Sequence, residues 1–250
     1  MISLQNISKT YRRRENKEKI NALNGVSFDI PERRITVVVG PSGCGKTTLL
    51  NIISGLDKSF EGQINFYNDQ HKVGYMFQTP SLIPWRTVWG NISIGCEIER
   101  ISQETYGPKA RLLLERYGLT EFAQEYPHTL SQGMQQRVAF IRLLLYGANL
   151  LLLDEPFSRL DYVVRRNLYR DLNSILNETE VTILAVTHDI EEAVVLADKI
   201  VILSPRPGRV VSEIQIPLAR SQRIDSTPDA LEEMKSYLIK VRKSLEVNGS

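Results

Sequence analysis

The chain has 250 residues, which is enough for one large domain or two small ones. With 42% hydrophobic and 24% charged residues, the composition argues against a disordered chain, and the net charge of +2 gives no reason to expect nucleic-acid binding. No hydrophobic run is long enough to cross a bilayer, and the first residues lack the layout of a signal peptide. The two cysteines, Cys44 and Cys96, make neither a disulfide framework nor a zinc site. We therefore expect a globular protein of the cytosol.

Two stretches near the start of the chain, residues 2–11 and 24–39, are predicted to form strands. Residues 35–39 form a β-branched run, which is typical of a strand buried on both faces of a sheet. The charged stretch 12–19 lies between the two, and it favours a solvated hairpin loop over a segment at lipid headgroups.

Strands and helices alternate further along the chain. Apolar runs at 150–153, 181–186 and 199–203 are each followed by a turn or a helical stretch, which indicates an α/β fold with a mainly parallel sheet. Between about 80 and 135 the pattern is helical without a strand, as at 109–117. We therefore predict a single domain with an α/β core of residues 1–79 and 136–217 and an inserted helical subdomain of about 80–135.

The tail from 218 to 250 is predicted to contain one helix. Pro228 follows Ser226 and Thr227, a pattern typical of a helix start. One face of this helix would carry apolar side chains, which favours packing on its own domain over a subunit contact. These side chains belong to Leu231, Met234, Leu238, Val241 and Leu245.

A glycine-rich segment follows the run at 35–39 and opens a helical stretch that includes Thr48. Small residues let consecutive backbone N–H groups face a phosphate, and the helix N-terminus adds a favourable dipole. Lys46 would supply a positive charge to the β- and γ-phosphates, and the Thr47 hydroxyl could bind Mg²⁺. The segment matches the phosphate-loop pattern G-x-x-x-x-G-K-[ST] with Gly40, Pro41, Ser42, Gly43, Cys44, Gly45, Lys46 and Thr47.

Two carboxylates, Asp154 and Glu155, come at the end of the apolar run 150–153. In an open α/β sheet, ligands bind beyond the carboxyl ends of the strands. Asp154 would therefore face the phosphate loop and hold Mg²⁺ or its waters, while Glu155 would polarise an attacking water. The alternative is a strand-end turn with solvated acids.

Together these residues resemble the nucleotide-binding subunit of the ATP-binding cassette transporters. The resemblance covers nearly the whole chain, and it implies a P-loop NTPase with a mainly parallel core sheet, an N-terminal antiparallel β subdomain and an inserted helical subdomain. It rests on motifs in the family's order, namely residues 40–47, Gln78, residues 130–134, Asp154 with Glu155, residues 158–161 and residues 187–189.

The resemblance implies an ATPase with ATP and Mg²⁺ as ligands. Tyr11 matches the aromatic residue that stacks on adenine, Gln78 the glutamine that senses Mg²⁺ and water, and His188 the switch histidine at the γ-phosphate. Glu155 is implied as the general base. Cys44 is interpreted as a small packing residue of the loop and not as a redox switch.

The resemblance also implies a homodimer with ATP between the two copies. Ser131 and Gly133 match the signature segment that binds the γ-phosphate of ATP held by the other copy, and Asp161 matches the loop that connects the two sites. The chain departs from the family pattern at Gln132 and Met134, which puts the strength of dimer closure in question.

Residues 80–92 and 203–209 are similar to those of the subgroup that imports nitrate, taurine and aliphatic sulfonates. We expect the segment from Gln78 to Ile92, with Trp85 and Trp89, to receive a helix of a membrane permease. Alternatively, both tryptophans pack the core. The subgroup implies a peripheral protein on the cytoplasmic face of the plasma membrane and an extracytoplasmic substrate-binding protein as an indirect partner.

Two rival functions fit the sequence less well. Cassette ATPases of DNA repair or translation usually carry two cassettes or long coiled-coil insertions, and this chain has neither. A small-molecule kinase would have no need for residues 130–134 or for His188.

Overall fold

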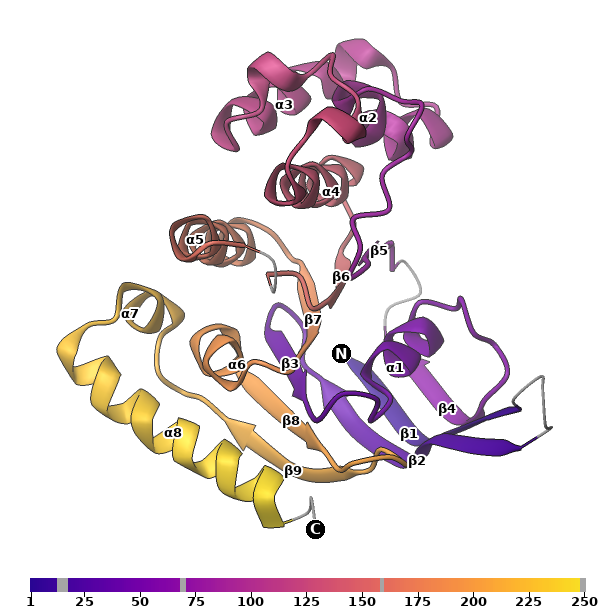
Figure 1. Cartoon of the computed structure of the whole chain (residues 1–250), viewed down its shortest axis with the longest axis vertical. Coiled ribbons are helices and arrows are strands. Elements are labelled where there is room, and N and C mark those ends of the chain that lie inside the picture. Colours follow the sequence, from indigo (N-terminus) through magenta and orange to yellow (C-terminus); the bar gives the residue numbers. More distant parts are fainter. Residues whose placement is uncertain (13–17, 68–70, 158–159, 248–250) are drawn as a thin grey trace.

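The computed structural model describes residues 1–12, 18–67, 71–157 and 160–247. It contains two sheets (Figure 1). The antiparallel sheet has the strand order β2 (Lys19–Ile30), β1 (Ile2–Arg12) and β4 (Glu61–Phe66). The six-stranded sheet has the order β5 (Val73–Met76), β6 (Leu150–Asp154), β7 (Thr182–Thr187), β3 (Ile35–Val39), β8 (Lys199–Leu203) and β9 (Val210–Gln215). Only β9 pairs antiparallel in this sheet.

The predicted α/β class with a mainly parallel sheet is confirmed, but the single strand expected over 24–39 is wrong. The chain leaves β2 at Ile30 and turns through Pro31 to Arg34 before β3 begins in the other sheet. Pro31 has no backbone N–H for a ladder, and Arg33 adopts a φ of 55°, which lies outside the extended region and turns the chain. The predicted hairpin loop at 12–19 lies mostly outside the described residues.

Helices α2 (Val88–Ile98), α3 (Gln103–Arg116) and α4 (Gln132–Tyr146) gather at one end of the molecule, with the short helices η1 (Thr120–Phe122) and η2 (Pro127–Thr129) between α3 and α4 (Figure 1). The expectation of helices without a strand at 80–135 is therefore confirmed. The division into a core and subdomains stays a prediction. The remaining helices are α1 (Lys46–Ile53), α5 (Tyr162–Glu178), α6 (Ile190–Leu196), α7 (Arg220–Asp225) and α8 (Pro228–Val247).

Helix α8 begins at Pro228 as predicted and packs on its own chain, against α6, β8 and β9 (Figure 1). Met234 and Val241 are buried in this contact, and Leu238 and Leu245 pack at its margin. Leu231 is 43% exposed, so the predicted face was wrong at this position. Ala230, one residue earlier, is buried instead because the helix is rotated toward it.

The central strands β3, β6 and β7 are buried along their whole lengths. Their side chains alternate between two hydrophobic clusters, with Val37 and Leu151 on one face of the sheet and Val38 and Leu152 on the other. Burial on both faces explains their continuous apolar sequences. Because the three strands are parallel neighbours, their carboxyl ends meet at one edge of the sheet.

Helix α6 starts one residue after the His188–Asp189 pair. The Asp189 side chain caps it by accepting hydrogen bonds from the backbone N–H of Glu191 (2.9 Å) and Glu192 (3.2 Å). Glu192 is only 4% exposed. Burial, and after it the negative charge of Asp189, raises the pKa of Glu192 to about 8.

The raised pKa predicts that Glu192 makes stability depend on pH. The protonated carboxyl stabilises the fold below the ordinary pKa of 4.5, and this contribution is lost as the pH rises through about 8. In Glu192→Gln the side chain stays neutral. The unfolding free energy of this variant relative to wild type should therefore improve by roughly 2 kcal/mol or more between about pH 5 and pH 9. Urea titrations at both pH values measure this, with the exposed Glu191→Gln as the matched control. An equal pH response of the two variants would contradict the prediction.

Candidate functional site

The glycine-rich loop connects β3 to α1. Gly45 lies just before α1 with a φ of 106°, and a Cβ there would lie 2.8 Å from the carbonyl oxygen of Ala22. Only glycine fits both the backbone angle and this close approach. Lys46 opens the helix and is 7% exposed; its Nζ donates hydrogen bonds to the carbonyl oxygens of Gly40 (2.7 Å) and Pro41 (3.2 Å). The ammonium group is thus folded onto the loop itself.

Cys44 packs underneath this loop. It is a free cysteine with 1% exposure, and a Cβ built on Gly40 would lie 2.8 Å from its Sγ. Burial raises the pKa of the Cys44 thiol, although the nearby Lys46 opposes the shift. A buried, protonated thiol is a poor nucleophile, so this geometry fits a packing residue.

An open groove of about 400 Å³ runs along the loop. One wall comes from the antiparallel sheet and one from the carboxyl edge of the core sheet. The groove is lined by Tyr11, Ile20, Ala22, Ser42, Gly43, Gly45, Lys46, Thr47, Thr48, Gln78, Glu155 and Arg206.

The hydroxyl group of Tyr11 lies at the start of α1, within hydrogen-bond distance of Thr48. This group donates to Asp57 Oδ2 (3.2 Å) and lies 3.4 Å from the Oγ1 of Thr48. The ring is 38% exposed, and the Nζ of Lys9 lies 4.9 Å from its centroid. The aromatic ring therefore stands at the rim of the groove, close to Thr48.

Asp154 lies at the end of β6 with 4% exposure. Burial raises the pKa of its carboxyl group, as does the charge of Glu155, while a hydrogen bond from Thr47 and the charge of Lys46 lower it. Thr47 and Asp154 thus bring a hydroxyl and a carboxylate oxygen together, which is the donor chemistry that Mg²⁺ prefers. A divalent cation would also offset the cost of a buried negative charge.

Glu155 holds two other segments of the site together. Its carboxylate accepts a hydrogen bond from Gln78 Nε2 (2.9 Å), and its other oxygen lies 2.9 Å from His188 Nδ1. Its backbone has a φ of 46° and its N–H donates to the carbonyl oxygen of Val186 (2.9 Å). Sequence reasoning named all three residues, but nothing in their spacing predicted that one carboxylate joins them.

Ser131, Gly133 and Asp161 do not line the groove. Ser131 caps α4 by accepting from the N–H of Met134 (3.3 Å), and Asp161 caps α5 by accepting from the N–H of Val164 (3.0 Å). Within one chain, the structure therefore does not bring these residues to the phosphate loop. Of the motif at 158–161, residues 158 and 159 lie outside the described residues.

Gln132, the departure from the family pattern, is the first residue of α4 and has no positive φ. The backbone there needs no glycine, so glutamine fits without strain.

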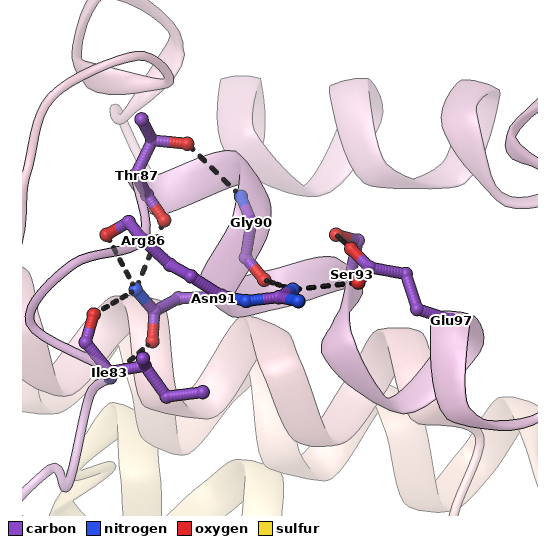
Figure 2. Close-up of polar contacts among 7 residues, drawn as sticks. All are labelled: Ile83, Arg86, Thr87, Gly90, Asn91, Ser93 and Glu97. Carbon is purple, nitrogen blue, oxygen red and sulfur yellow. Dashed lines mark hydrogen bonds and ion pairs between the residues drawn. The ribbon is translucent and has the colours of Figure 1, made fainter.

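The segment before α2 is a turn organised by Asn91, which is fully buried (Figure 2). Its Oδ1 accepts from the N–H of Ile83 (2.7 Å), and its Nδ2 donates to the carbonyl oxygens of Ile83 (3.1 Å), Arg86 (3.0 Å) and Thr87 (3.0 Å). A side-chain amide satisfied four times fixes residues 83–87 in one conformation. Trp85 lies in this turn and is 78% exposed.

The two tryptophans of this segment differ in environment. Trp89 packs against the main hydrophobic cluster, with its ring centroid 6.3 Å from that of Tyr106. Trp85 is exposed and does not pack in this cluster. The alternative that both tryptophans pack the core is therefore confirmed for Trp89 and wrong for Trp85, and docking of a permease helix stays a prediction.

Sequence reasoning missed Arg206 as a lining residue of the groove. In the sequence, residues 203–209 are notable only for their similarity to the importer subgroup. Arg206 reaches the groove because its segment packs on the phosphate loop, and this contact leaves no signal in the sequence. In the part of the chain that the structure describes, no helix has the length and hydrophobicity to span a membrane.

Known proteins resemble this chain over most of its length. Residues 23–158 match the family model described as ABC transporter. The taurine import ATP-binding protein TauB of Rhizobium johnstonii is 40% identical, over 84% of this chain and 82% of its own length. The aliphatic sulfonates import ATP-binding protein SsuB of Bacillus cereus is 38% identical, over 90% of each chain.

Solved structures agree as well. A dimeric ATP-binding cassette in a post-hydrolysis state with ADP and Pi superposes with a TM-score of 0.76 and 32% identity, over 88% of this chain and all of that one. With its phosphate loop, its acidic strand end and these matches, the chain belongs to the ABC transporter family, as an ATP-binding subunit with ATPase activity.

Proposed function

We propose that this chain powers the import of a small organic or inorganic anion or a related solute, of the taurine, sulfonate or nitrate type, as one of two identical ATPase subunits. The observation that carries the ATPase part is the convergence of Lys46, Asp154, Glu155 and His188 at one edge of the sheet. The names of relatives that align over most of the chain support the direction of transport and the substrate class.

In this proposal the nucleotide lies along the groove. Backbone N–H groups of residues 43–47 and the Lys46 ammonium bind the β- and γ-phosphates. Thr48 lies at the same helix start, and the exposed ring of Tyr11 offers its face to the adenine. The start of α1 thereby holds the phosphates, and the Tyr11 ring beside it holds the adenine.

Glu155 would act as the general base for the attacking water. Its carboxylate stands at the groove, and the contacts with Gln78 and His188 hold it in one orientation. A base that is fixed before the reaction loses little orientational freedom in the transition state.

Mg²⁺ would be held by Thr47 and Asp154, with Gln78 at the edge of the same groove. When bound, the ion supplies charge neutralisation for the phosphates. The buried Asp154 carboxylate is the group whose environment most favours such a cation.

The site would be completed by a second copy of the chain. Ser131 and Gly133 open α4 with an exposed hydroxyl and a helix N-terminus, which suit a phosphate, yet they do not reach the groove of their own chain. We therefore place them at the γ-phosphate of the partner copy's ATP, with Asp161 near the contact between copies. Dimeric relatives of the same fold support this arrangement.

The membrane permease would dock on the turn that carries Trp85. The Trp85 ring is exposed, which suits contact with a helix. The turn that carries it is held by the hydrogen bonds of Asn91 (Figure 2). The chain would then lie at the cytoplasmic face of the membrane, and a binding protein on the other side would deliver the solute.

Substitution of the proposed base tests the ATPase mechanism. Glu155→Gln keeps the size of the side chain but removes the proton acceptor, so turnover should fall by about 100-fold or more while ATP binding persists. Phosphate release and nucleotide titration measure the two effects. Glu191→Gln on the nearby α6 is the matched control and should keep wild-type turnover. Wild-type turnover in Glu155→Gln would refute the assignment.

Titration with Mg²⁺ tests the proposed cation site. Chelation of divalent cations should abolish turnover, and added Mg²⁺ should restore it. Asp154→Asn removes the buried charge, so the half-saturating Mg²⁺ concentration should rise by about tenfold or more. An unchanged Mg²⁺ requirement in this variant would show that Asp154 does not support the cation.

Exchange of each tryptophan separates docking from packing. Trp85→Ala should keep the melting temperature, because the ring is exposed, but should lower permease binding by about tenfold or more. Trp89→Ala should instead lower the melting temperature, since its ring packs on the core. Thermal melts and co-purification with the permease measure both. Full permease binding by Trp85→Ala would contradict this docking surface.

A further inference from the structure

We propose that Arg206 is a further nucleotide-binding residue, whose guanidinium group contacts the phosphate chain of the ATP held by the phosphate loop. The inference rests on the proposed function of this groove. Arg206 lies far from the loop in sequence, yet its side chain lines the same groove as Lys46, Thr47 and Thr48.

The segment that carries Arg206 is a compact turn closed by Ser204 and Arg209. The N–H of Ser204 donates to the carbonyl oxygen of Arg209 (2.9 Å), and the N–H of Arg209 donates to Ser204 Oγ (3.1 Å). The Ser204 hydroxyl also lies 3.0 Å from the carbonyl oxygen of Pro207. The turn therefore holds its own shape, with Arg206 near its middle.

Gly208 fastens this turn to β2 by two hydrogen bonds and packs it against the phosphate loop. Its N–H donates to the carbonyl oxygen of Ala22 (2.9 Å), and its own carbonyl accepts from the N–H of Asn24 (3.0 Å). A Cβ on Gly208 would lie 2.2 Å from the carbonyl oxygen of Cys44, so only glycine allows this contact. The turn rests directly on the backbone of the loop, and this contact brings Arg206, two residues earlier, to the groove.

The chemistry of the groove favours an anionic partner for Arg206. Lys46 donates to loop carbonyls inside the groove, while Arg206 is exposed at its rim. Among the described residues, Arg206 forms no ion pair with a carboxylate. A permanently charged, forked donor at the mouth of a phosphate-binding groove suits phosphate oxygens.

Arg209 provides a matched control within the same turn. It carries the same charge and is also exposed, but it does not line the groove. A general effect of positive charge on ATP binding would therefore affect both arginines, whereas a direct contact requires Arg206.

The test is the ATP affinity of the full chain, measured by calorimetry for Arg206→Ala, Arg206→Lys, Arg209→Ala and Lys46→Ala. We expect Arg206→Ala to weaken ATP binding by about tenfold, Arg206→Lys to recover part of it, and Arg209→Ala to change it less than about twofold. The loss in Arg206→Ala should shrink between roughly 50 and 500 mM NaCl, because salt screens a charge–phosphate contact at the rim.

Equal ATP affinities of Arg206→Ala and Arg209→Ala would overturn the inference. A loss in Arg206→Ala that is the same at both salt concentrations would also overturn it, since the contact would then not be ionic. Lys46→Ala tests separately whether the groove binds ATP at all. If this variant kept its ATP affinity, the proposed ATP site would itself be wrong, whatever the result for Arg206.

Discussion

The parallel alignment of β6, β7 and β3 is the constraint on which the site depends. Asp154 pairs in register with Val186, and Val39 with Thr187, so the chain leaves the three strands at one edge of the sheet. The phosphate loop, Glu155 and His188 follow those ends directly, and Asp154 is the last residue of β6. Strands buried on both faces cannot shift their register without moving apolar side chains, so the core holds the reacting groups in place.

Glu155 links the segments that follow these strands through its contacts with Gln78 and His188. Its left-handed backbone is a conformation that costs about 1–3 kcal/mol for a residue with a side chain, and the bond from its N–H to Val186 helps to hold it. The carboxylate then touches Gln78 and His188 at once. Gln78 precedes the segment with Trp85, so the residue that contacts the proposed base lies on one continuous stretch of chain with the proposed docking surface. This stretch extends from the core to the helices at one end of Figure 1.

Much of this arrangement could be predicted from the sequence, because local patterns carry it. The glycines and the lysine at 40–47 are typical of a phosphate loop. The apolar runs that end at Asp154 and Thr187 are typical of strands buried on both faces of a sheet. Other features depend on tertiary contacts that leave no local pattern. The break between β2 and β3, the different burial of Trp85 and Trp89, and the exposure of Leu231 are decided by which surfaces meet. The position of Arg206 depends on the contact of Gly208 with the backbone of Cys44, two segments distant in sequence.

The central claim is that ATP is hydrolysed at a site shared by two copies of the chain. Light scattering of Glu155→Gln during size-exclusion chromatography tests it most directly, because this variant should bind ATP without consuming it. We predict a monomer without nucleotide and a dimer with ATP, and the dimer should be lost when Ser131→Ala or Lys46→Ala is added. A chain that stays monomeric with saturating ATP, while the wild type hydrolyses ATP as a monomer, would contradict the account.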